Sequence, residues 1–375
     1  MKKSMKKTKV LYFVDTLEYG GIQTFIYNII KNIKNTEIDI LTLNDGIEYP
    51  LEEELKKYTK IYKLNVWLNS ISSYNKYKKE VNNFFKNHND YKIIHLHGTS
   101  KNYYILKVAK EYNISTRIIH SHSTNFETNN IIKKIIGNIL KRKLIKYSTN
   151  LFACSEDAGK WLFKNKEFNI IPNGIDIDKF KYNEKLRKEL IKKYNLKNKF
   201  IIGNIGRITY QKNSLFLLDI LKEVKQIKDN AFLIIIGSGE LENKLKDKIK
   251  EYNLEEDILL LKDIHDIYKY YNLFDCFVLP SLYEGFSIVV LEAQINGLEC
   301  IVNKDVLPKE VFISNNIIEV ENLNEYKKEI INSKRNNKNI DYSKYDIKEV
   351  TKYLEDYYQR RWLYEWFNKY NSTCL

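Results

Sequence analysis

Cysteine, proline and glycine are all scarce in this chain of 375 residues, which contains 4 cysteines, 4 prolines and 13 glycines. The cysteines include no CxxC pair and no group with the spacing of metal ligands, so we predict neither a disulfide framework nor a cysteine zinc site. So few prolines and glycines also argue against long flexible linkers. The cysteine pattern suits a reducing compartment, and we expect the protein in the cytoplasm.

Long apolar runs are missing as well. No segment approaches the ~20 apolar residues that a membrane-spanning helix needs. The apolar run at residues 10–14 is far shorter than the core of a signal peptide, and Asp15 follows it directly. We therefore expect a protein that is soluble or bound peripherally at the inner face of the cell membrane.

Positive charge is in excess, because 62 Lys and Arg residues against 48 Asp and Glu residues give a formal net charge of +14. Such a surface attracts anions, among them nucleic acids, anionic bilayers and phosphorylated substrates. The sequence shows no nucleic-acid-binding motif, and its aromatic residues are not interleaved with arginines in one patch. A basic nucleic-acid-binding protein is therefore the less favoured alternative, and we predict no nucleic-acid partner.

Short apolar runs alternate with longer amphipathic segments, and the pattern starts again after Pro172-Asn-Gly174. Strands that alternate with helices predict parallel βαβ units and a doubly wound sheet. The expected strands are 9–15, 38–43, 93–97, 117–121, 151–155 and 169–171 in the first block, and 200–205, 231–237, 258–261, 276–280 and 299–303 in the second. The expected helices include 20–34, 213–227, 240–252 and 287–296.

This pattern predicts an α/β protein with two Rossmann-like domains, residues 1–172 and 173–345, since chains of this length usually divide into two. The segment 346–370 looks helical and is rich in Tyr and Trp. We expect this C-terminal helix, about 346–375, to pack back on the first domain. Ligands bind such sheets at the carboxyl ends of the strands, so we expect a site in the cleft between two facing domains.

Two permanent cations follow the predicted strand 200–205. Arg207 comes directly after Gly206, and Lys212 stands just before the next predicted helix. An arginine can bind two oxygens of a diphosphate, a lysine acts as a point charge, and the helix dipole adds to both. The spacing alone is equally compatible with a loop that carries two solvated cations.

Two glutamates follow the predicted strand 276–280. Glu284 lies on a loop and Glu292 within the next helix, about two helical turns away, so both carboxylates can face one site and accept hydrogen bonds from sugar hydroxyls. The backbone N–H groups of residues 285–287 would lie at the start of that helix. Two glutamates at this spacing are also common by chance, and the bare spacing favours that interpretation.

The exact motifs in which these residues stand resemble those of glycosyltransferase family 4, whose members are retaining enzymes with the GT-B fold. Within the family, the chain is most similar to the branch that builds bacterial exopolysaccharide and capsule. The resemblance covers nearly the whole chain. Its carriers are Gly20-Gly21-Ile-Gln-Thr, Ile119-His-Ser-His-Ser123, Ala153-Cys-Ser155, Ile171-Pro-Asn-Gly-Ile-Asp176, Gly206-Arg207 with Gln211-Lys-Asn213, Gly237-Ser-Gly-Glu-Leu241, Leu279-Pro-Ser-Leu-Tyr-Glu-Gly-Phe286, Glu292-Ala-Gln and Gly297-Leu.

The resemblance implies a role for each catalytic residue. Arg207 and Lys212 would bind the diphosphate of a nucleotide-sugar and neutralise the leaving group. Glu284 would hold hydroxyls of the donor sugar, and Glu292 would accept hydrogen bonds from the ribose hydroxyls. His120, at the end of a strand in the first domain, would reach the donor sugar from across the cleft.

The resemblance also implies donor-binding roles for four residues without charge. Backbone amides near Gly285, Phe286 and Ser287 would assist Glu284. Gly21 would let the chain pass close to the phosphate and the donor sugar.

The implied reaction moves a hexose-type sugar from a nucleoside-diphosphate sugar, expected to be a UDP-sugar, to a saccharide acceptor that is expected to be lipid-linked. The leaving phosphate itself would take the acceptor's proton, so neither a dedicated base nor a metal is expected. We predict no cofactor, because no Asp-X-Asp follows a strand in the first half of the chain. The alternative within enzymes is another nucleotide-sugar reaction, such as an epimerase or a hydrolase.

Four histidines stand in two His-X-His pairs, each after a predicted strand. Alternation along a strand points the two members of a pair to the same face. His95 and His97 form one pair, and His120 and His122 form the other. Such pairs can bind zinc, but we favour a structural role for His95 and His122 and predict no metal.

Residues 131–146 form a predicted basic amphipathic helix, with isoleucines and leucines on one side and lysines with Arg142 on the other. Helices of this kind lie on anionic membranes. The alternative is a helix that packs on its own sheet and exposes its basic face to water. Because the resemblance implies a lipid-linked acceptor, an anionic membrane surface is kept as a partner for this helix.

Overall fold

The computed structural model describes residues 7–68, 70–126, 130–264, 266–336 and 341–372, and the side chains of the last helix up to residue 362. The chain divides into two compact units. The first unit comprises Met1–Ile175 and Lys344–Leu375, and the second comprises Asp176–Ser343. The chain thus passes between the units at Ile175, three residues after the boundary expected from the sequence.

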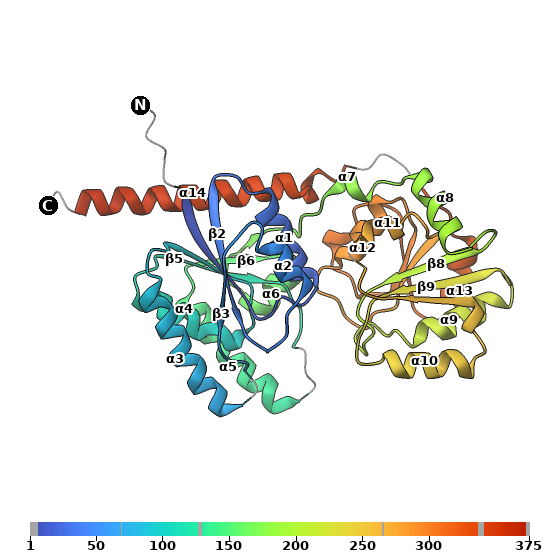
Figure 1. Cartoon of the computed structure of the whole chain (residues 1–375), viewed down its shortest axis with the longest axis horizontal. Helices are drawn as coiled ribbons and strands as arrows, with labels where there is room; N and C mark the ends of the chain where they lie inside the picture. The colour runs from blue at the N-terminus through green and yellow to red at the C-terminus, as the bar shows by residue number, and fades with distance from the viewer. Residues whose placement is uncertain (1–6, 69, 127–129, 265, 337–340, 373–375) are drawn as a thin grey trace. The chain divides into compact units, whose positions relative to one another are not determined.

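The first unit is built on a parallel sheet with the strand order β3-β2-β1-β4-β5-β6-β7 (Figure 1). The order reverses between β1 and β4, the place where doubly wound sheets open a binding crevice at their carboxyl ends. Its strands are β1 (Thr8–Val14), β2 (Thr36–Leu43), β3 (Ile61–Leu64), β4 (Ile93–Leu96), β5 (Thr116–Ser121), β6 (Asn150–Ala153) and β7 (Asn169–Ile170). Its helices are α1 (Gly21–Asn32), α2 (Pro50–Leu55), α3 (Ile71–Asn87), α4 (Tyr103–Glu111), α5 (Ile131–Tyr147), α6 (Glu156–Phe163) and α14 (Ile347–Ser372), with the 3-10 turns η1 (Ser100–Asn102) and η4 (Ser343–Tyr345).

The C-terminal helix α14 packs on the first unit, against α1 and β1 (Figure 1). Leu354 and Tyr358 are fully buried in the same hydrophobic cluster as Tyr12 of β1. The hydroxyls of Tyr12 and Tyr358 lie 2.6 Å apart. The backbone of Ile175 also pairs with that of the returning segment beside Asp346. The last three residues of the helix expected at 346–375 lie outside the described residues.

The second unit is built on a parallel sheet with the strand order β10-β9-β8-β11-β12-β13, which reverses between β8 and β11 (Figure 1). Its strands are β8 (Phe200–Ile205), β9 (Ala231–Ile236), β10 (Ile258–Leu261), β11 (Cys276–Leu279), β12 (Cys300–Asn303) and β13 (Ile317–Val320). Its helices are α7 (Ile177–Phe180), α8 (Glu184–Lys193), α9 (Phe216–Lys225), α10 (Glu242–Glu251), α11 (Ile267–Tyr270), α12 (Ile288–Ile295) and α13 (Leu323–Asn332), with the 3-10 turns η2 (Glu255–Asp257) and η3 (Lys309–Val311).

The two sheets confirm the predicted α/β class with two Rossmann-like units. The central strands of both sheets are buried on both faces and are continuous apolar runs, such as β9, in which every residue is buried. Among the described residues, no helix combines the length and the apolar character needed to cross a membrane.

Candidate functional site

The loops that follow β8 and β11 meet at the point where the second sheet reverses its order. β8 and β11 are neighbours in the sheet, and each ends in a loop that carries predicted site residues. Arg207 and Lys212 lie after β8, and Glu284 lies after β11. Because parallel strands end at the same edge of a sheet, these loops lie together at the edge where such sheets bind ligands.

Lys212 and Glu284 form an ion pair across this point, with 2.6 Å between Nζ and Oε1. The side chain of Glu284 is only 6% exposed and that of Lys212 only 17%. A charge pair so far removed from water interacts more strongly than an exposed pair. The structure therefore brings together two residues that stand 72 positions apart in the sequence.

Gln211 holds the two loops to each other. Its side-chain amide donates to the backbone carbonyl of Tyr283 at 3.0 Å, and its backbone carbonyl accepts from the amide of Leu282 at 2.8 Å. Arg207 is exposed, and its guanidinium donates to the side chain of Gln211 at 3.4 Å. A guanidinium held at one nitrogen retains further N–H donors for an anion.

Two glycines after β9 support the loop of Arg207 from behind. A Cβ on Gly237 would meet the carbonyl oxygen of Gly206 at 2.0 Å, and one on Gly239 would meet the carbonyl oxygen of Ile208 at 2.4 Å. The amide of Ile208 donates to the carbonyl of Ser238 at 2.8 Å. The backbone that precedes and follows Arg207 is thus fixed by chain that approaches too closely for any side chain.

Glu292 is buried within α12 and accepts a hydrogen bond of 2.5 Å from the hydroxyl of Tyr271. Burial raises the pKa of Glu292 to about 8, although the hydrogen bond from Tyr271 lowers it in part. At neutral pH the carboxyl is therefore largely protonated. Glu284 and Glu292 each have their own partner, Lys212 and Tyr271, so the two glutamates are not an acid–base couple joined to each other.

The start of α12 supplies the remaining predicted donor-binding residues of the second unit. Gly285 is half-buried, while Phe286 and Ser287 are 7% and 4% exposed. Ser287 is the N-cap residue, yet its side chain caps no amide of the helix, and its buried Oγ has no hydrogen-bond partner among the described residues. First-turn amides without a side-chain cap and a hydroxyl without a partner favour an anionic or hydroxyl-rich ligand here.

The two predicted residues of the first unit lie near its own point of reversal. Gly21 is the first residue of α1, and His120 lies near the end of β5. His120 is 1% exposed and packs edge-on against Phe25 at 5.5 Å between ring centroids. Burial lowers the pKa of His120 well below its usual value, so the ring is neutral at pH 7. The donor role of these residues stays a prediction.

Three contributions to this site were not predicted from the sequence, namely the hydroxyl of Tyr271, the contacts of Gln211 between the two loops and the close backbone approach at Gly237. Tyr271 is one of 29 tyrosines and stands in no motif that marks it. Gly237 had a signal, because it stands at the end of a predicted strand with a second glycine two residues later. Gln211 also stands in a motif of the resemblance, so only Tyr271 had no signal in the sequence.

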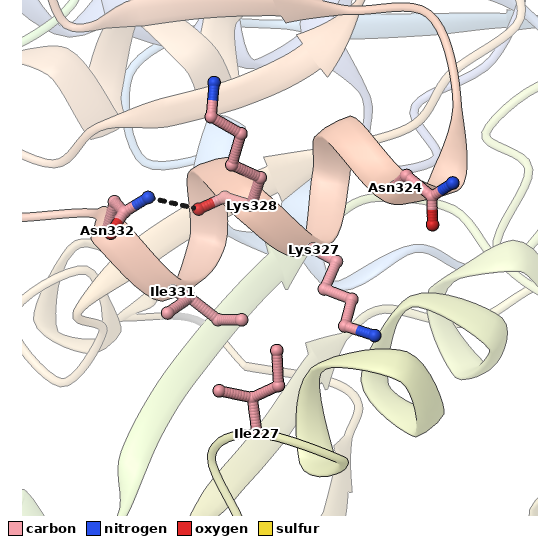
Figure 2. Close-up of a pocket in the computed structure, with 6 residues that line it drawn as sticks. All are labelled: Ile227, Asn324, Lys327, Lys328, Ile331 and Asn332. Atoms are coloured by element: carbon pink, nitrogen blue, oxygen red, sulfur yellow. Dashed lines mark hydrogen bonds between the residues drawn. The ribbon is translucent and has the colours of Figure 1, made fainter.

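A shallow hollow of about 290 Å³ lies elsewhere on the second unit, between α13 and the end of α9 (Figure 2). Figure 2 shows Ile227 and Ile331 approaching each other across it, while Lys328 points away. Lys327 is held by Glu223 and Gln226, each at 3.1 Å. None of the lining residues is a predicted site residue, and we assign this hollow no function.

Two family models match the chain. The model described as "Glycosyl transferases group 1" matches residues 186–349. The model described as "Glycosyltransferase Family 4" matches residues 19–179. The first match falls almost entirely in the second unit and the other in the first unit.

The curated relatives carry names of the same kind. The putative glycosyltransferase EpsF of Bacillus subtilis is 29% identical over 313 residues, with 80% of each chain covered. The UDP-Gal:alpha-D-GlcNAc-diphosphoundecaprenol alpha-1,3-galactosyltransferase of Escherichia coli is 34% identical over 227 residues, which are 57% of this chain and 58% of that protein.

Solved structures share the architecture over nearly the whole length. The crystal structure of Anabaena HepE in complex with UDP-glucose is similar with a TM-score of 0.77, covering 94% of this chain and 99% of that one. At 15% sequence identity this similarity concerns the fold. The two-unit architecture inferred from the strand pattern is therefore one that solved structures share.

Proposed function

From the premise that this chain belongs to glycosyltransferase family 4 and is a glycosyltransferase with the GT-B fold, we propose that it transfers a hexose-type sugar from a UDP-sugar to a saccharide acceptor. The acceptor is lipid-linked, and the reaction belongs to bacterial surface polysaccharide synthesis. Support comes from the Escherichia coli relative, whose name contains a UDP-sugar donor and a diphosphoundecaprenol-linked acceptor.

The observation that carries this proposal is the pair of cations beside a buried carboxylate at the reversal of the second sheet. Arg207 and Lys212 bind the donor diphosphate, and Glu284 binds hydroxyls of the donor sugar. When the phosphate enters, Lys212 shares its charge between the phosphate and Glu284. Glu284 thereby fixes the sugar relative to its leaving group, since both are held through the same ion pair.

The reaction is retaining and requires no metal. Negative charge grows on the leaving diphosphate as the bond to the sugar breaks, and fixed cations stabilise that charge more in the transition state than in the ground state. Arg207, Lys212 and the amides of residues 285–287 supply this stabilisation. Glu292 accepts hydrogen bonds from the ribose hydroxyls, while Gly21 and His120 line the approach to the donor sugar. The leaving phosphate accepts the proton of the acceptor hydroxyl.

The test is transfer and donor hydrolysis by the purified protein with a panel of nucleoside-diphosphate sugars, with and without EDTA. Lys212→Ala should lower kcat by about 10²–10³-fold, the loss typical for removal of one group that stabilises developing charge. Its control is Lys246→Ala, which removes the same charge from an exposed i,i+4 pair on α10 and should leave kcat unchanged. Equal activity of the two variants would contradict the site assignment, and an epimerised donor without acceptor would identify a different enzyme class.

We further propose that α5 of the first unit lies on the anionic membrane that carries the acceptor, at the cytoplasmic face. Gly137, Lys141 and Leu144 are buried and hold α5 against the unit. Helical spacing places the isoleucines on the opposite side, away from the protein. These are Ile131, Ile132, Ile135, Ile136 and Ile139, exposed by 73%, 68%, 56%, 50% and 49%.

Cations accompany this apolar stripe. Arg142 and Lys143 are exposed on α5 itself. A cavity of about 430 Å³ beside α5 is lined by Lys141, Arg142, Lys164 and Lys166 together with apolar and amide residues. Apolar side chains that enter the interface next to cations that face lipid headgroups are the mark of a helix lying on a membrane.

Vesicle sedimentation tests this contact. The double variant Ile132→Ser with Ile136→Ser should lose binding to vesicles that contain phosphatidylglycerol while keeping its unfolding midpoint, because both side chains are already half exposed or more. Ile227→Ser, at a 65% exposed position of the second unit, is the matched control and should bind as wild type. Undiminished binding of the double variant would exclude the isoleucines as the contact.

A further inference from the structure

Tyr271 is a fully buried tyrosine of the second unit that stands directly after α11. Its hydroxyl donates to Oε2 of Glu292 at 2.5 Å, across 21 positions of the sequence. Among the described residues, no other group is hydrogen-bonded to this carboxyl. The carboxyl of Glu292 therefore takes its orientation from a single hydroxyl.

The ring of Tyr271 is packed on more than one side, so its hydroxyl is fixed in place. Phe180 contacts the ring edge-on at 5.6 Å between centroids, and Phe277 lies tilted against it at 5.9 Å. The backbone carbonyl of Tyr271 accepts from the guanidinium of Arg335 at 3.2 Å. The same guanidinium donates to the backbone carbonyl of Phe274 at 2.6 Å. Both the ring and the backbone that carries it are thus held, and the bond to Glu292 has a defined direction.

The bond from Tyr271 leaves most of the carboxylate available to a ligand. An ionised carboxylate has about four lone-pair sites on its two oxygens, and the hydroxyl of Tyr271 uses one of them. Glu292 is 7% exposed, so few waters compete for the remaining sites. Two neighbouring hydroxyls of one ligand can therefore donate to the same carboxylate.

The hydroxyl of Tyr271 also favours the form of Glu292 that accepts. Burial raises the pKa of Tyr271 well above its usual value, so the hydroxyl keeps its proton. Burial raises the pKa of Glu292 to about 8, and the hydrogen bond from Tyr271 opposes that rise. Without the hydroxyl, the pKa of Glu292 would rise further. A protonated carboxyl offers fewer acceptor sites, so removal of this hydroxyl should weaken binding to a ligand with two hydroxyls.

We propose that Tyr271 is a positioning residue that sets the carboxyl of Glu292 to accept from both hydroxyls of the donor ribose, so that the site selects ribonucleoside over 2′-deoxyribonucleoside diphosphates. This inference rests on the ribose-binding role proposed for Glu292. A buried group that accepts from a ligand hydroxyl discriminates against the analogue that lacks it, because the acceptor is then left unpaired. Tyr271 acts only through Glu292.

The test compares the binding of UDP and 2′-deoxy-UDP to the full chain by isothermal titration at about pH 8, the pKa of Glu292. These two probes differ in one ribose hydroxyl. Wild type should bind UDP more tightly by about tenfold or more, as expected for one hydrogen bond to a charged group. Tyr271→Phe keeps the packed ring and should lower this ratio of affinities by about three- to tenfold. With a UDP-sugar, the same variant should raise KM and leave kcat nearly unchanged, because the ribose is held equally in the ground state and the transition state.

Tyr91→Phe is the matched control, because the hydroxyl of Tyr91 donates at the same 2.5 Å to the buried carboxyl of Asp39 in the first unit. This variant loses a bond of the same kind and should keep the wild-type ratio of affinities. A merely structural role would lower the unfolding midpoint of both variants and leave both ratios unchanged. Equal ratios in Tyr271→Phe and Tyr91→Phe would therefore overturn the inference, as would equal binding of UDP and 2′-deoxy-UDP by wild type.

Glu292→Ala distinguishes this inference from the proposed function. It removes the carboxyl and should lower the ratio, and the addition of Tyr271→Phe should then change the ratio no further. A ratio that falls in Glu292→Ala but not in Tyr271→Phe would overturn the positioning role alone. A ratio that stays unchanged in Glu292→Ala would overturn the ribose assignment in the proposed function, and the role of Tyr271 with it.

Discussion

The two sheets of this protein reverse their strand order in the same way, but their buried side chains at the reversal differ, being an ion pair in one unit and neutral rings in the other. In the second unit the reversal between β8 and β11 carries charge, with Lys212 paired to Glu284 and Arg207 exposed beside them. In the first unit the reversal between β1 and β4 carries buried neutral rings, with His95 next to Tyr12, and one carboxylate, Asp15, that accepts from the side-chain amide of Asn102. In a doubly wound sheet the strand order therefore sets the position at which polar side chains cluster, and the sequence of the loops sets their charge.

This difference assigns different expected roles to the two reversals. A diphosphate leaving group requires cations that exist before the bond breaks, and Arg207 and Lys212 provide two of them at the reversal of the second unit. Neutral imidazoles can donate and accept hydrogen bonds or bind a metal, but they cannot neutralise a leaving diphosphate. Variants that disturb one reversal and spare the other test this division.

The largest expected effect comes from the glycines behind Arg207. Gly237→Ala would place a Cβ 2.0 Å from the carbonyl oxygen of Gly206 at a φ of +149°, so both overpacking and backbone strain oppose it. Each of these costs ~1–3 kcal/mol. We expect the unfolding free energy, measured with urea, to fall by that order and donor affinity to fall with it.

Gly206→Ala is the matched control for that variant. Its Cβ would meet only the side chain of Lys212, at 3.8 Å, which is an ordinary contact. We expect a stability close to wild type. If Gly237→Ala and Gly206→Ala were equally stable, the close backbone approach around Arg207 would not be what shapes the loop.

Much of the fold was predictable because the strands are buried on both faces and read as apolar runs. The bounds expected for β8 and β10 are those of the structure, and most other expected elements differ by one or two residues. The helix expected at 213–227 begins later, at Phe216, because Asn213 adopts a φ of +52° and the chain turns before the helix starts. The edge strand β3 has four residues and little burial, so it left no clear pattern.

The sequence predicted that Lys212 and Glu284 lie on loops after strands, but it did not predict how the side chains pair. Motifs placed Lys212 and Glu284 on loops after two strands, yet nothing in their spacing indicated a contact 72 residues apart. The sequence likewise gave no reason to connect Glu292 with Tyr271, since burial and not spacing makes that hydroxyl matter. Contacts between loops depend on the strand order, which the spacing along the chain leaves open.

A medium effect is expected from the protonation of Glu292, whose pKa of about 8 lies well above its usual 4.5. Ribose hydroxyls donate to the ionised carboxylate, so donor affinity should rise with pH from 6 to 9, by up to about tenfold per unit below pH 8. Isothermal titration with UDP-sugar measures this rise. Glu292→Gln should bind more weakly and without this pH dependence.

Stability should respond with the opposite sign. The folded state binds a proton on Glu292 between pH 4.5 and 8 that the unfolded state has released, so this group stabilises the fold below pH 4.5 and loses that contribution as pH rises through 8. The unfolding free energy of wild type should therefore fall relative to Glu292→Gln over this range. A constant difference would show that Glu292 is ionised in the folded protein and would remove the basis of the predicted affinity profile.

The smallest effect concerns a lysine of the first unit that, unlike Lys212, is held by aromatic rings. Nζ of Lys141 lies 3.2 Å from the ring centroid of Trp161 and 4.3 Å from that of Phe126. Burial, assisted by the charge of Lys164, lowers the pKa of Lys141 from 10.5 to about 8. Between pH 8 and 10.5 the unfolded state binds more protons than the folded state, so this group makes stability rise with pH.

The unfolding free energy of wild type should thus increase relative to Lys141→Met across that range. Lys143→Met, at an exposed position of the same helix, should show the same pH dependence as wild type. Equal slopes for the two variants would mean that Lys141 titrates like an exposed lysine.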